Sequence, residues 1–324
     1  MRFRVHHETR YRYRAPVTLG AHVIRLRPRE DATQRLVHHS LVIDPAPEKA
    51  TGATDAEGNV ITYAWFTDVR TDALTITSAF EVETLRTDAF DYLLDANFTA
   101  VPVRYPIEVA RVLQPYLAGE AAASVRDFAT AVRGDAGEAP PAFLDALNRA
   151  IHTRTRLAIR DDGRPAQSAA ETLALGRGAC RDATVLFMEA ARCMGFAARF
   201  VSGYRRGDLT RPDRHLHAWA EVFIPGGGWR GWDPVEGVGV ADRHVALAAS
   251  AEQMHTMPVS GAYFGSGVGS TLGYTIRIEA ESITFPLAIS AALRRQGVHC
   301  AHEWEPNRWC GGKTRKRKAW RRYR

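Results

Sequence analysis

The chain has 324 residues, of which 45% are apolar and 24% charged, a composition typical of a soluble globular protein with a substantial core. Its formal charge of +7 is local, because residues 311–324 hold eight Lys or Arg and no acid, which leaves −1 (+7 minus 8) for the remainder. No apolar run approaches a membrane span, no apolar leader follows Met1, and four cysteines are too few for a disulfide framework. We therefore expect a reduced, cytoplasmic protein that does not associate with membranes.

The first part of the chain alternates apolar and polar residues over short segments. Residues 3–13 predict a strand with one aromatic face and one charged face. Turn residues separate this segment from further alternating ones, at 22–27, 34–43, 60–66 and 74–84. Because no helical period appears between them, we predict an antiparallel β-rich N-terminal domain over residues 1–87, either a sandwich or a small barrel.

From about residue 88 the pattern becomes helical. An irregular crossing segment comes first, and predicted helices follow at 108–117, 121–132, 141–153 and 183–194. Strands come after the last of these helices, an order typical of an α+β core. Past the core strands we expect a short helix at 245–251, a glycine-rich loop, and strands at 275–278 and 283–285. We place this helical lead-in and core at 88–290, and a basic, disordered tail at 291–324.

Cys180 stands at the predicted start of a helix. Gly176 and Gly178 interrupt the chain just before it, and the apolar run 183–194 ends at Gly195. A thiol reacts as its thiolate, which the free N–H groups and the positive dipole end of a helix N-terminus stabilise. We therefore interpret Cys180 as a candidate nucleophile.

A histidine and an aspartate follow on a predicted β-hairpin. Residues 216–224 alternate, so that His217 points away from a face of small aliphatic side chains, and the chain returns after a turn through Asp233. If Val222 pairs with Gly228 across a five-residue loop, Asp233 lies directly opposite that histidine. A tighter turn would shift the register and separate Asp233 from His217, unless a bulge corrects the register.

These three residues form a candidate catalytic set. Cys180 would attack an acyl carbon, and His217 would take the thiol proton and later return it to the leaving group. Asp233 would hold the tautomer of the imidazole and stabilise its cation. The backbone N–H of Cys180 is the natural first donor to an oxyanion, and the second donor is left open.

Five short motifs surround and connect these residues. They are GACRD (178–182), RCMGF (192–196), AARFVSGY (197–204), LHAWAEV (216–222) and GWRGWDP (228–234). In this order they resemble the core of bacterial transglutaminase-like proteins, and the first part of the chain looks like the β-rich N-terminal region of many such proteins. The resemblance runs from near Met1 to about residue 280. It implies a papain-like core with a Cys-His-Asp triad on Cys180, His217 and Asp233. It does not imply protein cross-linking, because the superfamily is also similar to cysteine peptidases and amidases.

Residues near the candidate triad also have structural interpretations. His215 shares a face with His217 and competes for the role of base, although its place at the strand's edge predicts solvent exposure. Cys193 lies within a helix among apolar residues and is interpreted as a buried, inert thiol. Arg181 and Asp182 are expected to organise the helix start. The tryptophans of the hairpin either line an acyl channel or belong to the core: Trp219, Trp229 and Trp232.

Beyond about residue 293 the chain shows no period. It is either a disordered basic tail or the product of a shifted reading frame at the end of the gene. Its candidate metal ligands follow no zinc-finger spacing, so we predict no metal and no other cofactor; they are His299, Cys300, His302 and Cys310. The glycines at 265–269 lack the strand and helix that flank a nucleotide-binding loop. The basic run 313–324 is expected to be solvated, without specific nucleic-acid binding.

The sequence thus predicts a transglutaminase-like thiol enzyme that forms a thioester on Cys180 with a peptide or protein amide. Water resolves such an acyl-enzyme in a peptidase or amidase, and an amine resolves it in an acyltransferase. We favour hydrolysis. The alternative is a non-catalytic scaffold or binding protein that retains the fold. The identity of the substrate and the oligomeric state are not predicted.

Overall fold

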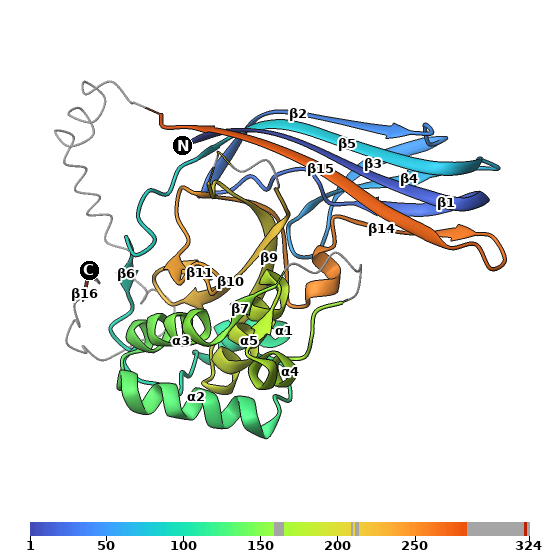
Figure 1. Ribbon diagram of the computed structural model, residues 1–324. Helices are drawn as coiled ribbons and strands as arrows, with labels where there is room; N and C mark the ends of the chain where they lie inside the picture. The colour runs from blue at the N-terminus through green and yellow to red at the C-terminus, as the bar shows by residue number, and fades with distance from the viewer. Residues whose placement is uncertain (159–164, 209, 211–213, 284–320, 323–324) are drawn as a thin grey trace.

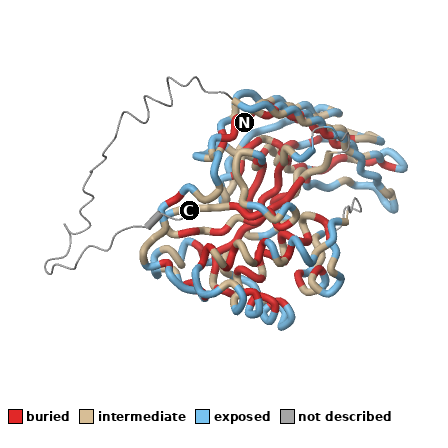
Figure 2. The backbone as a smooth tube through the Cα atoms, turned by 60° about the vertical axis from the view of Figure 1, so that its left-hand side comes forward, coloured by how far each residue is buried: buried red, intermediate tan, exposed pale blue. Residues whose placement is uncertain are grey.

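The computed structural model describes residues 1–158, 165–208, 210, 214–283 and 321–322. Its elements form three layers: a large antiparallel sheet, a smaller sheet, and a group of helices (Figure 1). In this view the smaller sheet lies between the large sheet above it and the helices below it. Buried backbone is concentrated where these layers meet (Figure 2). Among the described residues, no helix is both long enough and apolar enough to cross a membrane.

The large sheet is organised around one long strand, β1 (Arg2–Ile24). The first half of β1 lies between β5 and β15, and its second half pairs with β4 and β14. Strands β2 and β3 pair with β5 and β4. The bounds of these strands are β2 (Gln34–Asp44), β3 (Lys49–Thr54), β4 (Val60–Trp65), β5 (Arg70–Thr84), β14 (Val259–Phe264) and β15 (Ser270–Glu281). The β-rich N-terminal domain is therefore one curled antiparallel sheet.

Two features of this sheet differ from the sequence predictions. Segments 3–13 and 22–27 were expected as separate strands, but residues 3–13 and 22–24 belong to the single strand β1, because the chain passes Ala15-Pro16 with an irregularity in the ladder instead of a break. Strands β14 and β15 lie inside the range 88–290 assigned to the core, yet they pair with β1. Pairing of β15 along residues 2–13 and burial of Ile276 explain this placement.

The smaller sheet has the strand order β12-β11-β10-β9-β13. Its strands are β9 (Ala198–Arg205), β10 (His217–Ile224), β11 (Gly228–Asp233), β12 (Val238–Gly239) and β13 (His244–Ser250). The helices are α1 (Ile107–Leu117), α2 (Ala123–Ala136), α3 (Pro140–Arg154), α4 (Ala169–Leu175), α5 (Cys180–Cys193) and the short 3₁₀ helix η1 (Gln253–Thr256). Two short pairs complete the described elements: β7 (Arg156–Leu157) with β8 (Arg177–Gly178), and β6 (Leu93–Leu94) with β16 (Arg321–Arg322).

The segment predicted as a helix at 245–251 is the strand β13, so that prediction was wrong. Its alanines and leucine favour a helix when taken alone, but both of its faces are buried. Val245 and Leu247 pack into the core of the large sheet, while Ala249 packs against Trp219 of the smaller one. A strand covered on both sides has no apolar alternation, which removes the signal for a strand.

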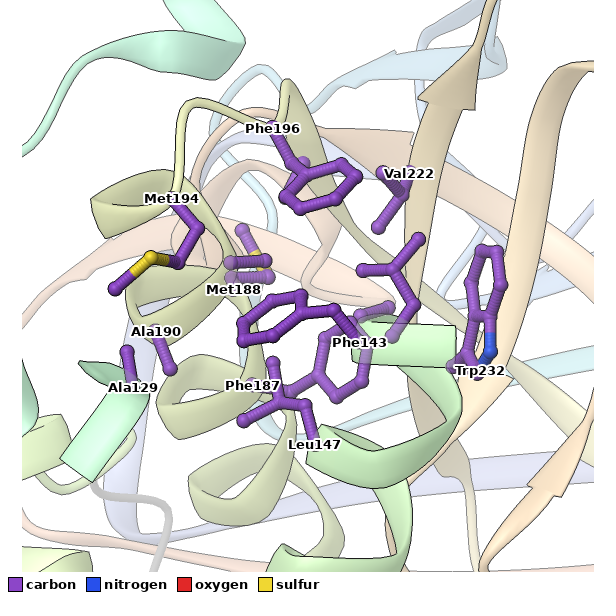
Figure 3. Packing of buried hydrophobic residues seen from close by; sticks show 14 of the residues in the cluster. Ala129, Phe143, Leu147, Phe187, Met188, Ala190, Met194, Phe196, Val222 and Trp232 are labelled. Carbon is purple, nitrogen blue, oxygen red and sulfur yellow. The ribbon is translucent and has the colours of Figure 1, made fainter. Parts of the chain in front are cut away.

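The helices are held to the smaller sheet by a dense aromatic and aliphatic core (Figure 3). Phe187 of α5 stacks on Trp232 of β11 with ring centroids 6.4 Å apart, and Phe143 of α3 stacks on Phe196 at 5.6 Å. The indole Nε1 of Trp232 donates to Asp145 Oδ1 of α3 at 2.9 Å. Trp232, the residue just before Asp233, is thereby fixed by a stacked ring and by a hydrogen bond from its indole nitrogen.

Two buried amide side chains join the large sheet to the smaller one at β13. Gln34 donates to the carbonyl of Ala246 at 2.8 Å and accepts its N–H at 2.8 Å. Asn59 makes the same pair of bonds to Ala249, each at 2.8 Å. Both amides are almost fully buried and act as short extensions of the ladder along β13. The N-terminal domain therefore determines where β13 lies.

Replacing Asn59 with alanine is expected to lower the free energy of unfolding by about 2–4 kcal/mol. The substitution leaves the buried N–H and carbonyl of Ala249 without their side-chain partner, and each unsatisfied group costs about 1–3 kcal/mol. Urea unfolding of the two proteins measures the difference. Asn97→Ala is the matched control, because Asn97 bonds only within an exposed turn and its loss should change the free energy by less than about 0.5 kcal/mol. Equal effects of the two substitutions would contradict the docking role of Asn59.

Candidate active site

Cys180 is the first residue of α5, and its side chain is half-buried. Asp182 organises the helix start, since its Oδ2 accepts the N–H of Ala179 at 2.7 Å and its Oδ1 accepts that of Gln167 at 2.8 Å. Gly178 is required there, because a Cβ would lie 2.8 Å from the Cβ of Asp182. These contacts hold the thiol at the positive end of the α5 dipole.

His217 begins β10 and is almost fully buried between Cys180 and Asp233. The sulfur of Cys180 lies 3.9 Å from the backbone oxygen of Leu216, the residue before His217. The thiol of Cys180 is among the groups whose interactions with the His217 ring raise the pKa of the imidazole. Nε2 of His217 lies 2.7 Å from Oδ2 of Asp233, which leaves Nδ1 as the nitrogen that serves the thiol.

The hairpin that carries His217 and Asp233 has a different register from the one expected. Ile224 pairs with Gly228 across three residues, and Ala220 pairs with Trp232. One further step along this ladder places Asp233 opposite Trp219, two residues from His217. The expectation that a tighter turn separates the two was wrong, because a shift of two residues keeps every side chain on its face. The long imidazole then reaches the carboxylate along the diagonal of the ladder.

Asp233 is fully buried and accepts hydrogen bonds on both oxygens. Oδ1 accepts the backbone N–H groups of Val235 at 3.0 Å and Glu236 at 3.2 Å. Oδ2 accepts from His217 and also from Nε2 of a second histidine, His244, at 3.1 Å. The carboxylate is therefore fixed by four donors, and its charge is balanced without solvent.

The protonation states of the pair follow from these contacts. Burial acts to lower the pKa of His217, but the charge of Asp233 and the hydrogen bonds to Asp233 and Cys180 outweigh it and raise the pKa to about 10. Burial acts to raise the pKa of Asp233, yet the charge of His217 and the hydrogen bonds from His217 and His244 hold it far below its usual range. At neutral pH the pair is an imidazolium and a carboxylate.

The same three side chains also meet a geometric criterion for a metal site. One ligand atom from each of His217, Asp233 and His244 lies within 4.8 Å of the others. Both Nε2 atoms, however, lie at hydrogen-bonding distance from a single carboxylate oxygen, and hydrogen bonding accounts fully for that arrangement. Cys180 beside the ring adds a nucleophile that proton transfer would activate. We therefore interpret the group as a proton-handling site.

Two family models match this chain. The model of the bacterial transglutaminase-like N-terminal region matches residues 3–83, and that of the transglutaminase-like superfamily matches residues 124–234. The chain belongs to the transglutaminase-like superfamily. The second match contains Cys180, His217 and Asp233. The family predicted from the five motifs is confirmed.

Relatives of this transglutaminase-like protein are similar over most of their length. An uncharacterised protein of Mycobacterium tuberculosis (strain ATCC 25618 / H37Rv) is 29% identical over 302 residues, which is 86% of this chain and 92% of that protein. One from Mycobacterium leprae (strain TN) is 24% identical over 293 residues, or 82% and 94% of the two chains. A crystal structure from Cytophaga hutchinsonii, described as "a Putative Cysteine Protease", has a TM-score of 0.65 and 19% identity, and the match covers 88% of this chain and 92% of that one. Its likeness confirms the papain-like α+β fold.

The structure also locates the other residues singled out from the transglutaminase-like sequence. His215 is half-buried, and its Nδ1 is hydrogen-bonded to the hydroxyl of Tyr274, so it faces β15 instead of Cys180. Cys193 is half-buried as well, contrary to the expected buried thiol, and it lines a cavity of about 480 Å³ at the far end of α5. Trp219 and Trp232 are sealed in the core, which excludes them as an open channel.

Other sequence predictions concern the tail of the transglutaminase-like chain. The candidate metal ligands His299, Cys300, His302 and Cys310 lie outside the described residues. Most of the basic run 313–324 does too. Its described residues, Arg321–Arg322, form β16, which pairs with β6.

Sequence reasoning missed His244. It directly precedes the segment 245–251, which was predicted as a helix. A helix there gives no reason to expect a contact between His244 and Asp233. Only the pairing of β13 with β9, which lies next to β10, brings it within reach of the carboxylate. A signal was present in principle, because a histidine that opens an apolar segment shortly after a motif aspartate is a candidate partner for it.

Proposed function

We propose that this chain is a thiol enzyme that forms an acyl-enzyme on Cys180 from a peptide or protein amide and hydrolyses it. The observation that carries the proposal is His217, buried between Cys180 and Asp233 with its pKa raised to about 10. Such a histidine takes the thiol proton readily and keeps it as an imidazolium beside the thiolate. The superfamily and the papain-like fold support the same class of chemistry.

The steps follow from the positions of these groups. The thiolate of Cys180 attacks the acyl carbon, and the carbonyl becomes an oxyanion close to the N–H groups at the start of α5. The C–N bond breaks as the His217 imidazolium gives its proton to the departing amine, which leaves a thioester. Water then attacks the thioester while His217 takes a proton from it, and the thiolate is released together with the acid. Asp233 stays ionised throughout.

The test is turnover of peptide and amide libraries by the purified protein, with and without a labelled primary amine. We expect release of free acid and amine, a transient acyl group on the peptide that contains Cys180, and no incorporation of the label. Incorporation of the amine would replace hydrolysis with acyl transfer as the second step. The matched control is Cys193→Ser, which removes the other described cysteine and should leave turnover unchanged.

A non-catalytic scaffold is the competing proposal, and thiol alkylation separates the two. A scaffold predicts that Cys180 reacts with iodoacetamide at neutral pH no faster than a free cysteine peptide does, and that His217→Ala does not alter the rate. The enzyme predicts fast alkylation that depends on His217. The proposal includes a peptide or protein amide as the partner and the cytoplasm as the location. The reaction needs a reduced thiol at Cys180, and the cytoplasm keeps thiols reduced.

A further inference from the structure

Asp233 serves two histidines from two different strands, and only one of them contacts the thiol. His217 of β10 and His244 of β13 both place Nε2 on Oδ2, at 2.7 and 3.1 Å. We propose that His244 is a positioning residue of the thiol site, whose Nε2–H holds the Asp233 carboxylate where it stabilises the His217 imidazolium. This inference rests on the proposed function and adds to it a fourth residue that does not touch substrate.

The hydrogen bonding of His244 determines its tautomer and charge. Its Nε2 contacts a carboxylate oxygen and therefore carries a proton. Its Nδ1 is buried and has no hydrogen-bond partner among the described residues, so a proton on that atom would be both charged and unsolvated. Burial lowers the pKa of His244, and the charges of His217 and Arg205 act in the same direction against the raising effect of Asp233. His244 is a neutral donor.

Three strands of the smaller sheet each contribute one charged group that acts on His244. These groups are Asp233 from β11, His217 from β10 and Arg205 from β9. The guanidinium of Arg205 is itself paired with the carboxylate of Glu236. With His244 neutral, the buried carboxylate has one cationic histidine partner, the imidazolium of His217. A second positive charge on the same oxygen would weaken the hold of Asp233 on His217.

The strand that carries His244 is held from outside the smaller sheet. Gln34 and Asn59 of the N-terminal domain bond to the backbone of β13, and Thr84 of β5 donates to the carbonyl of Asp242 at 2.8 Å. The position of His244 therefore depends on the N-terminal domain. Through His244 and Asp233, the large sheet contributes to the geometry of the thiol site.

The test measures the pH dependence of alkylation at Cys180 by iodoacetate in the full-length protein, with the modified peptide quantified by mass spectrometry. An anionic reagent reacts fast while the His217 imidazolium is present and slows as the imidazolium loses its proton. In the wild type we expect this alkaline limb near pH 10. In His244→Leu the carboxylate loses a donor and its fixed position, so the limb should move down by about one pH unit. His244→Gln supplies an amide N–H and should restore most of the shift.

Each outcome of this test decides the proposal. A limb that stays in place in His244→Leu, moves upward, or moves equally in the Leu and Gln variants would reduce His244 to a packing residue. His255→Leu, at an exposed histidine of η1, is the matched control and should change nothing. If thermal melting shows that His244→Leu does not fold, His244→Asn replaces it, because its shorter amide cannot reach Oδ2. Slow, pH-insensitive alkylation of Cys180 in the wild type would instead overturn the proposed function itself.

Discussion

The Cys180→Ala variant is expected to lose turnover of every amide substrate, by a factor on the order of 10³ or more. The variant retains the fold, because the side chain at the start of α5 is only half-buried and the helix start depends on Asp182. His217→Ala should show a loss of similar size, since removing either member of a coupled nucleophile and base abolishes the step that both perform. Steady-state kinetics on the best substrate from the library measures both losses.

The control for this prediction is the second described cysteine on the same helix. Cys193 lies at the opposite end of α5 from Cys180. Burial raises the pKa of its thiol, so Cys193 is a poor nucleophile. Turnover by Cys193→Ser should equal that of the wild type. Turnover by Cys180→Ala at more than a few per cent of the wild-type rate would mean that another group forms the covalent bond, or that none is formed.

Asp233→Asn is expected to lower kcat/KM by a factor on the order of 10³–10⁴. The amide carries no charge, so the pKa of His217 falls from about 10 towards its usual value and the imidazolium is no longer favoured beside the thiolate. The side-chain NH₂ of asparagine is a donor, so one of the two positions that accept hydrogen bonds in Asp233 can no longer accept any. Kinetics at pH 7 measures the loss, and Asp72→Asn, at an exposed aspartate of β5, is the matched control.

The same variant should change the pH dependence of stability. Because the folded-state pKa of His217 is raised above its usual value, the stability that it contributes is fully present below about pH 6.5 and is lost as pH rises to about 10. Because the pKa of Asp233 is lowered, its contribution is present above its usual pKa and is lost as pH falls below that value. Urea unfolding of the wild type and Asp233→Asn should therefore differ most near pH 5, and the difference should narrow as pH rises to about 10. A difference that grows between pH 5 and pH 10 would contradict the assigned charges.

Local patterns predicted the elements around the site well. The helices at 108–117, 121–132 and 141–153 agree with α1, α2 and α3 to within a few residues. Their apolar stripes are regular, and a surface helix needs only its own sequence to show which face it buries. The start of α5 at Cys180 was equally visible, because Gly178 and Asp182 act within three residues of it.

Long-range pairing was the part that local patterns did not predict. The strand β13 was taken for a helix, and β14 and β15 were placed with the core although they complete the sheet of β1. Each of these strands is stabilised by partners far away in the sequence, and the free energy of that pairing does not appear in the strand's own residues. The connection through Ala15-Pro16 likewise became a bulge only because neighbouring strands extend past it.

By itself the sequence determined which residues this protein brings to its chemistry, and on which faces. A few consecutive residues are enough to show a cysteine at a helix start that glycines precede, and a histidine and an aspartate on the same face of a hairpin. Side chains in a strand alternate with a period of two, so a register shift of two residues leaves both on that face. Only the tertiary structure decided that His217 reaches Asp233 along a diagonal and that His244 shares the same oxygen. The physical reason is that these contacts join strands whose order is chosen by burial of the whole sheet between two other layers, and no short segment contains that information.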